Sequence, residues 1–308
     1  MSAIGYYIFY CLIRTVTLLP LQVLYLLSDV TYYFTYYLIR YRRQVVFTNL
    51  RRAFPENDER QNRQIAKRFY RHYCDLLAET MKLVHMSPVE IRKRVRYLNP
   101  GLLDELYDRG KSVIAVIGHY GNWEWLAGLP LHIKYQAFAI YKPMNNKQFD
   151  RFFIRLREQY GVKTFPMEHT VRRMVENRRN GLRTITMFLS DQRPIKRTIR
   201  YWTTFLRQDT PVLLGAERLA KKLDEAVVFF DVRKVQRGYY EVEFRLITDD
   251  PSGTKPCEIT EKHVRVLESI IIEKPEYWLW SHRRWRHDKA RWLTWAEQHS
   301  INLNTAEH

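Results

Sequence analysis

Residues 113–125 read VIAVIGHYGNWEW. The first five residues form a continuous apolar run, which is typical of a short strand buried on both faces of a sheet. The loop that follows contains His119 between two glycines, and the helix expected over residues 122–133 begins beside Glu124. This stretch therefore predicts a buried strand that delivers a histidine to one edge of a sheet.

Strand and helix patterns alternate along the chain outward from this stretch. The expected strands are residues 113–117, 136–141, 184–189, 226–232 and 239–246, and the expected helices are residues 57–85, 101–109, 122–133, 146–160, 171–180, 211–223 and 260–274. This alternation predicts an α/β fold with a mostly parallel central sheet flanked by helices. Ligands of such sheets bind beyond the carboxyl ends of the strands, so the loops after residues 117, 141 and 189 are the expected site.

The N-terminal 40 residues are unusually apolar. Arg14 and Asp29 are the formally charged residues between positions 3 and 39, and Pro20 separates two apolar runs. A basic cluster follows, made of Arg40, Arg42 and Arg43. Because the basic residues come after the apolar runs, the segment does not fit a cleaved signal peptide. The positive-inside rule keeps the chain beyond this cluster in the cytoplasm.

Each apolar run is near or just below the length of about 20 residues that spans a bilayer. We therefore favour one spanning or deeply embedded helix, with helices that lie in the interface or pack on the domain as the alternatives. The expected domains are an N-terminal membrane-anchoring helical segment, residues 1–43, and a catalytic domain, residues 44–308.

The charge of the chain is strongly positive. Lys and Arg number 51 against 33 Asp and Glu, which gives a net charge of +18. Such a protein attracts an anionic partner: nucleic acid, an anionic membrane leaflet, an acidic protein or a phosphorylated ligand. The three cysteines, Cys11, Cys74 and Cys257, are far apart and indicate free thiols in a reducing compartment. We expect no bound cofactor and no metal, since neither a nucleotide loop nor a ligand cluster is present in the sequence.

His119 and Glu124 have the residue types of a general-base pair. Glu124 can fold back and accept a hydrogen bond from the imidazole, which fixes its tautomer while the other nitrogen takes a proton. A plainer interpretation is a histidine that ends a strand and a glutamate that favours a helix N-terminus.

The chain resembles the lipid A biosynthesis (lauroyl/myristoyl) acyltransferases, within the wider glycerol-3-phosphate acyltransferase-like group with its HxxxxD/E motif. The resemblance extends from the apolar N-terminus to about Arg286. Five segments in the same order carry it: NLRRAFP at 49–55, GHYGNWE at 118–124, the segment 141–161 beginning YKP, SDQ at 190–192 and WSHRRW at 280–285.

The resemblance implies that His119 deprotonates a lipid hydroxyl and that Glu124 orients the histidine. The hydroxyl then attacks an acyl thioester, carried by acyl carrier protein or by coenzyme A. No covalent acyl-enzyme is expected, because the chain has no Gly-x-Ser-x-Gly elbow. A lipid A precursor, an anionic glycolipid, is the expected acceptor, with an aminolipid or a lysophospholipid as alternatives. The implied location is the bacterial inner membrane, with the catalytic domain facing the cytoplasm.

Four residues are the candidates for substrate binding. Arg157 suits an oxyanion or an acceptor phosphate, with Arg155 as its rival on the same helix. Asp191 follows a predicted strand at the expected site, although a turn-forming Asp is the alternative. Asn122 and Lys142 complete the set, but a lysine lacks the fork of an arginine, which puts a phosphate clamp at Lys142 in doubt.

Two basic segments admit other functions. Residues 193–200 suit a docking surface for an acidic carrier protein or for lipid phosphates, with no preference between them, and residues 278–286 mix Trp, His and Arg. Aromatic-basic mixtures also bind nucleic acid, but no RNA-binding or zinc-finger signature occurs and we expect no nucleic-acid partner. A membrane scaffold without activity is the third alternative, although a scaffold has no need of His119 and Glu124.

Overall fold

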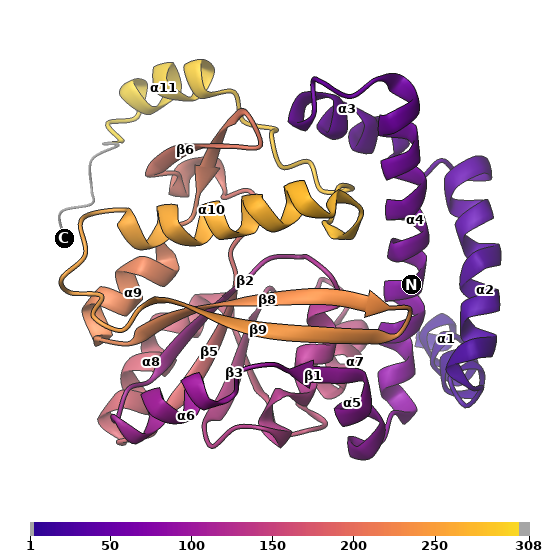
Figure 1. Cartoon of the computed structure of the whole chain (residues 1–308), viewed down its shortest axis with the longest axis horizontal. Coiled ribbons are helices and arrows are strands. Elements are labelled where there is room, and N and C mark those ends of the chain that lie inside the picture. The colour runs from indigo at the N-terminus through magenta and orange to yellow at the C-terminus, as the bar shows by residue number, and fades with distance from the viewer. Residues whose placement is uncertain (1–2, 302–308) are drawn as a thin grey trace.

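The computed structural model describes residues 3–301 and has an α/β architecture (Figure 1). Its central sheet has seven strands in the order β1 (Val95–Tyr97), β9 (Tyr239–Thr248), β8 (Ala226–Gln236), β2 (Val113–Ile117), β5 (Thr184–Leu189), β3 (Gln136–Tyr141) and β4 (Lys163–Pro166). The five strands from β8 to β4 are parallel, whereas β9 is antiparallel to β8 and β1 is parallel to β9. The predicted fold class, a mostly parallel sheet flanked by helices, is confirmed.

Helices surround this sheet. The α-helices are α1 (Ala3–Val16), α2 (Leu21–Tyr33), α3 (Arg43–Ala53), α4 (Glu59–Lys82), α5 (Pro88–Arg94), α6 (Gly101–Asp108), α7 (Lys147–Glu158), α8 (Thr170–Arg179), α9 (Gly215–Leu223), α10 (Glu258–Glu273) and α11 (Lys289–Gln298). A π-helical turn, η1 (Phe34–Leu38), extends α2. The short 3-10 helices are η2 (Leu83–His85), η3 (Trp123–Leu131), η4 (Met167–His169), η5 (Lys196–Thr198) and η6 (Pro275–Tyr277).

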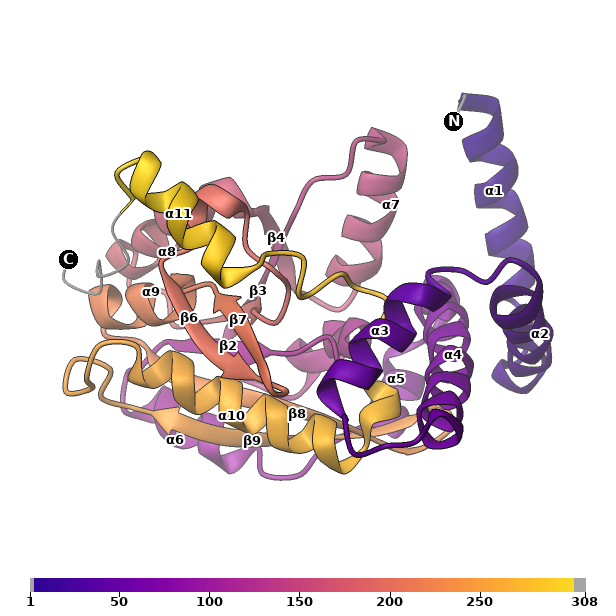
Figure 2. The same ribbon diagram turned by 90° about the horizontal axis from the view of Figure 1, so that it is seen from above.

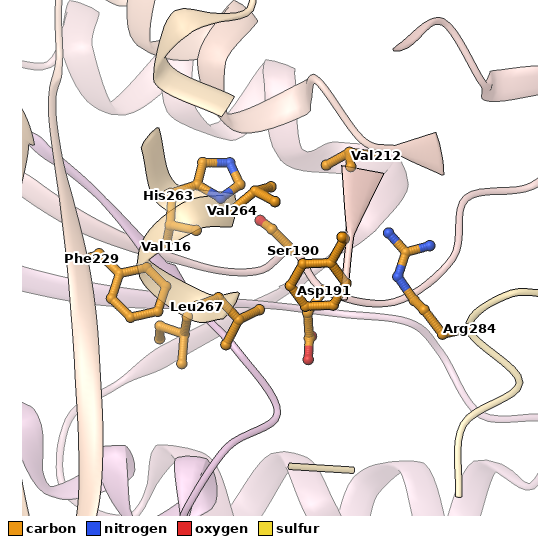
Figure 3. Close-up of a pocket in the computed structure, with 11 residues that line it drawn as sticks. Val116, Ser190, Asp191, Val212, Phe229, His263, Val264, Leu267 and Arg284 are labelled. Atoms are coloured by element: carbon orange, nitrogen blue, oxygen red, sulfur yellow. The ribbon is translucent and has the colours of Figure 1, made fainter. Parts of the chain in front are cut away.

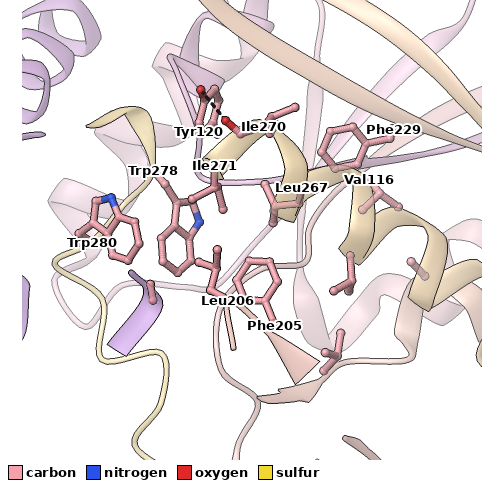
Figure 4. Close-up of a cluster of buried hydrophobic side chains, with 14 of the residues drawn as sticks. Val116, Tyr120, Phe205, Leu206, Phe229, Leu267, Ile270, Ile271, Trp278 and Trp280 are labelled. Carbon is pink, nitrogen blue, oxygen red and sulfur yellow. Dashed lines mark hydrogen bonds between the residues drawn. The ribbon is translucent and has the colours of Figure 1, made fainter. Parts of the chain in front are cut away.

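Strand β2 lies in the middle of the sheet and is buried along its whole length. Its side chains alternate between two cores: Ile114 and Val116 pack with helices α8, α9 and α10, and Val113, Ala115 and Ile117 pack with α5, α6, α7 and η3. Figure 4 shows part of the first core, where Val116 and Phe229 of the sheet meet Leu267 of α10 and the indoles of Trp278 and Trp280. A strand that is covered on both faces has a continuous run of apolar residues, and residues 113–117 form such a run.

The long helix α4 joins the N-terminal helices to the sheet. It starts with a capping box between Asp58 and Gln61. Helix α2 packs along α4, on the side of the molecule opposite α11 (Figures 1 and 2). The contact is reinforced by Arg237, whose guanidinium donates to Asp75 of α4 and Asp29 of α2.

The N-terminal helices do not have the length that the sequence analysis favoured. Helices α1 and α2 have 14 and 13 residues and are separated by a turn that ends at Pro20. Within residues 3–301, no helix is long and apolar enough to cross a membrane, so the expected spanning helix is not found. The domain boundary at residue 43 stays a prediction.

The segment before α9 also differs from expectation. A helix was predicted from Pro211, but this residue lies in β7 (Gln208–Val212), which forms an antiparallel hairpin with β6 (Tyr201–Phe205). The turn consists of Leu206 and Arg207, both with positive φ. Two-residue hairpin turns of this type usually carry Asn or Gly, so the local sequence contains no hairpin signal. The helix expected over residues 122–133 is the 3-10 helix η3, which contains Pro130.

Candidate active site

The site lies where β2 and β5 end side by side. The two strands are parallel neighbours with Ile117 paired to Leu189, so the residues just beyond them meet at one edge of the sheet. His119 follows β2 and Asp191 follows β5, and the imidazole Nδ1 lies 2.5 Å from the Asp191 Oδ1. The order of the strands thus brings together two residues that are 72 positions apart in the chain.

The carboxylate of Asp191 is buried and fully hydrogen-bonded. Besides the contact with Nδ1, Oδ2 accepts the backbone N–H of His119 at 2.8 Å and the indole N–H of Trp278 at 2.8 Å. Burial would raise the pKa of Asp191, but the charge of His119 and these hydrogen bonds lower it to about 2. A carboxylate held in this way stays ionised, so it accepts a hydrogen bond from a protonated Nδ1.

This contact sets the tautomer of His119. With Nδ1–H donating to Asp191, the other nitrogen, Nε2, carries a lone pair. The amide nitrogen of Gln192 lies 3.0 Å from Nε2 and donates to it, and the ring of Trp123 packs edge-on against the imidazole. The side chain of His119 is 12% exposed. The histidine is therefore rigidly held, and its Nε2 can accept a proton once the Gln192 amide moves aside.

Glu124 does not orient the histidine, contrary to the expectation from the sequence. Both of its carboxylate oxygens bind Arg157 of α7, at 2.9 Å to Nε and 2.7 Å to Nη2. Burial raises the pKa of Glu124, but the charge and hydrogen bonds of Arg157, together with smaller effects of His119 and Trp123, lower it overall. The orienting carboxylate is Asp191, because strand pairing places it directly at Nδ1, whereas the start of η3 directs Glu124 towards α7.

The ion pair with Glu124 distinguishes Arg157 from Arg155, the other candidate on the same helix. Arg157 is largely covered and grips Glu124 through two parallel hydrogen bonds, the geometry that makes arginine–carboxylate pairs strong. Arg155, on the same helix, is exposed. Among residues 3–301, no group accepts a hydrogen bond from Nη1 of Arg157, so this nitrogen keeps its donors for a ligand. The pair also lies close enough to His119 for the charge of the imidazole to act on Glu124.

Asn122 has a different environment from the one expected of a substrate-binding residue. It is buried, its Oδ1 caps η3 by accepting the N–H of Trp125, and its Nδ2 donates to Glu79 of α4 at 2.7 Å. The other oxygen of Glu79 accepts the hydroxyl of Tyr25 on α2, and Tyr240 also donates to this carboxylate. Asn122 thus holds the loop in place from inside the protein.

The backbone of the loop is fixed as firmly as its side chains. The N–H of Gly121 donates to the carbonyl of Tyr277, and the ring of His72 bonds the carbonyl of Gly121. Gly121 has a φ of +62°, and a Cβ there would come within 2.5 Å of the carbonyl oxygen of Val232. Glycine is therefore required at this position.

A small cavity lies behind Asp191, between the sheet and α10 (Figure 3). Its wall is mainly apolar, but the guanidinium of Arg284 also reaches it. Arg284 is 2% exposed, donates through Nη2 to the carbonyl of Pro211, and has no partner for Nε and Nη1 among the described residues. Burial lowers the pKa of Arg284 to about 10, and the charge of Asp191 opposes this change. The guanidinium remains a cation behind the carboxylate of Asp191.

The other expectations concern Lys142, His282, the thiols and metals. Lys142 lines a basic groove together with Gln192, and His282 accepts the backbone N–H of Arg193. The cysteines of the described chain are free. Within residues 3–301, His, Cys, Asp and Glu form no group of three or more suited to a metal; the absence of a cofactor stays a prediction.

Three residues of the site escaped the sequence analysis. Gln192 and Trp278 were noted only within longer motifs, and nothing local indicates that they contact His119 and Asp191. Glu79 could have been found, because it falls on the buried stripe of α4 between Leu76 and Leu83, where a charged residue needs a partner.

Replacement of Trp278 by phenylalanine tests the role of its indole N–H. The variant leaves the buried carboxylate one hydrogen bond short, and we expect a loss of about 1–3 kcal/mol in the free energy of unfolding, measured by urea titration. Trp202→Phe is the matched control, because its buried indole N–H has no hydrogen-bond partner among the described residues. Equal losses in the two variants would show that Trp278 contributes packing alone.

A search of curated proteins gives no match. The family model described as bacterial lipid A biosynthesis acyltransferase matches residues 1–287, which include every site residue discussed above. The chain therefore belongs to the bacterial lipid A biosynthesis acyltransferase family.

Proposed function

We propose that the protein is a membrane-associated O-acyltransferase that moves a fatty acyl group from a thioester donor to a hydroxyl of a lipid A precursor. The family indicates an acyltransferase. The observation that carries the finer proposal is the His119–Asp191 pair, which leaves Nε2 of a buried imidazole as a base at the working edge of the sheet. Acyl carrier protein or coenzyme A carries the acyl group.

The proposed reaction begins when the acceptor hydroxyl replaces the Gln192 amide as the hydrogen-bond donor to Nε2 of His119. As the hydroxyl oxygen bonds to the thioester carbonyl carbon, its proton passes to Nε2, and Asp191 stabilises the resulting imidazolium. The tetrahedral intermediate then collapses with cleavage of the carbon–sulfur bond. The proton on Nε2 passes to the leaving sulfur, so that the products are an ester and a thiol and the histidine is neutral again.

Arg157 is the proposed stabiliser of negative charge in this reaction. Glu124 holds its guanidinium by two hydrogen bonds, and Nη1 has no acceptor among the described residues. A donor held rigidly at the developing oxyanion needs no reorganisation when the charge appears. Glu124 thus acts through Arg157.

An apolar surface on α1, α2 and η1 supports association with a membrane. Helix α2 buries one stripe against α4 and exposes the opposite stripe, which includes Leu26 at 66% and Val30 at 53% exposure, and the following turn exposes Leu38 at 71%. Exposed apolar residues on one face of a molecule often mark a site of membrane or protein interaction. The basic cluster at residues 40–43 follows directly and suits an anionic leaflet. We infer that these helices lie in the interface of the inner membrane, with the site on the cytoplasmic side.

An acyl-transfer assay on purified membranes tests the reaction. With labelled acyl carrier protein and total host lipid, we expect wild type to add one acyl chain, and the mass of the product distinguishes a lipid A precursor from an aminolipid or a lysophospholipid. His119→Ala is expected to abolish transfer. Asp191→Asn is expected to lower kcat by about 10³–10⁴-fold, because an amide at this position favours the wrong tautomer.

Glu124→Gln serves as the comparison. It weakens the hold on Arg157 while leaving the tautomer of His119 intact, so we expect a loss of about 10²–10³-fold. Near-normal turnover of the folded His119→Ala variant would contradict the assignment of the base. Absence of transfer by wild type with every donor would contradict the enzymatic proposal and leave the membrane scaffold as the alternative.

Binding to lipid vesicles tests the apolar surface. The double variant Leu26→Glu/Val30→Glu places two charges on the exposed stripe of α2, and we expect it to weaken cosedimentation with anionic vesicles at least about tenfold. Val171→Glu is the control, because Val171 is an exposed apolar residue on α8, away from this surface. Unchanged binding of the double variant would show that α2 does not contact lipid.

A further inference from the structure

A basic groove borders the site on the side of α11. Its wall contains five cationic side chains, Lys142, Arg193, Lys196, Arg286 and Arg291. Asp288 is the carboxylate in the same wall, and it accepts the backbone N–H of Arg291 at the start of α11. The groove is formed by three segments that are distant in sequence: the end of β3, the chain after β5 and the C-terminal segment.

The charges of the groove are not compensated within the protein. Among residues 3–301, none of the five cations forms an ion pair with a carboxylate. Nη1 of Arg193 is buried without a hydrogen-bond partner among the described residues. Burial lowers the pKa of Arg193, and the charges of Arg286 and Arg283 lower it further. An anion in the groove would relieve this repulsion and accept the unused donors.

The groove is continuous with the catalytic residues through Gln192. This side chain lines the groove, and its amide nitrogen lies 3.0 Å from Nε2 of His119. His282 also lines the groove and accepts the backbone N–H of Arg193. A ligand whose anionic group lies among the five cations can therefore place another part of itself beside the base.

The groove lies far from the surface proposed to contact the membrane, so the acyl donor and the lipid acceptor can approach the site from different sides. The apolar surface of α1 and α2 lies on the opposite side of the molecule from α11 (Figures 1 and 2). The N-terminal helices have their own basic cleft, lined by Arg40, Arg43, Arg51 and Arg63 with Glu59 and Phe47, and its positive charge suits anionic head groups. The wall of the α11 groove includes one strongly exposed apolar side chain, Ile195. The α11 groove is thus suited to a ligand that arrives from water.

We propose that this groove binds the phosphate of the phosphopantetheine arm of the acyl donor, an inference that rests on the proposed function. Acyl carrier protein and coenzyme A share this arm, which ends in the thioester. Its long flexible chain lets the phosphate lie among Arg193, Arg286 and Arg291 while the thioester reaches His119 past Gln192. The guanidinium groups match the oxygens of a phosphate in geometry as well as in charge.

Direct binding measurements test the proposal without any turnover. By isothermal titration, wild type should bind 4′-phosphopantetheine at least about tenfold more tightly than pantetheine, which lacks the phosphate. Arg286→Glu/Arg291→Glu should abolish that difference, because it reverses two charges of the groove. Arg172→Glu, an exposed position on α8, is the control and should retain it. Circular dichroism establishes that each variant is folded.

Kinetic measurements identify which of the two substrates binds in the groove. In the transfer assay, Arg286→Glu/Arg291→Glu should raise KM for the donor at least about tenfold and leave KM for the lipid unchanged. A comparison of coenzyme A with holo acyl carrier protein shows which source of the arm the groove serves. Equal binding of phosphopantetheine and pantetheine, or a rise in KM for the lipid alone, would overturn the proposal. Failure of wild type to transfer acyl groups would overturn the proposed function, while the titrations still decide the groove.

Discussion

The buried carboxylate of Asp191 links three parts of the chain. It accepts hydrogen bonds from the backbone and ring of His119 and from the indole of Trp278. A buried charge is unfavourable unless it is paired and hydrogen-bonded, so the carboxylate requires the loop after β2, the loop after β5 and the C-terminal segment to be in place together. The fold and the tautomer of the histidine depend on the same contacts.

The supporting structure extends outward from this interaction. The loop of His119 is held through Asn122 by Glu79, and Glu79 in turn binds Tyr25 of α2. Helix α2, which carries the exposed apolar surface, is therefore connected to the loop of His119 by hydrogen bonds to a single buried carboxylate. Arg157, held by Glu124, forms a separate unit from α7. His119 and Arg157 are thus positioned by different elements.

The sequence predicted the central elements well because their signals are local. The apolar run Val113–Ile117 is the strand β2. The segment of alternating apolar and polar residues from Tyr239 is the strand β9, in which buried and more exposed side chains alternate over the first half of the strand. The hairpin turn at Leu206 and Arg207 carries no turn residue and was missed. The length of the N-terminal helices was also misjudged, because apolar residues on both faces of α2 serve the core on one side and remain exposed on the other.

The site was predicted only in part, because local signals place single residues at strand ends but do not show which of them come into contact. His119 and Asp191 were both placed at the ends of strands, but their pairing depends on β2 and β5 being neighbours, which no local pattern encodes. Proximity in sequence favoured Glu124 as the partner of His119 instead. Gln192 and Trp278 contact the pair only through the tertiary structure.

The tautomer of His119 is the most direct test of this account. Heteronuclear NMR of protein labelled at the imidazole nitrogens, with the His119→Ala spectrum to identify its signals, reports which nitrogen of the neutral ring carries the proton. The account predicts a proton on Nδ1 in wild type and its transfer to Nε2 in Asp191→Asn. A proton on Nε2 in wild type would contradict the role of Asp191 and of the strand pairing that places it.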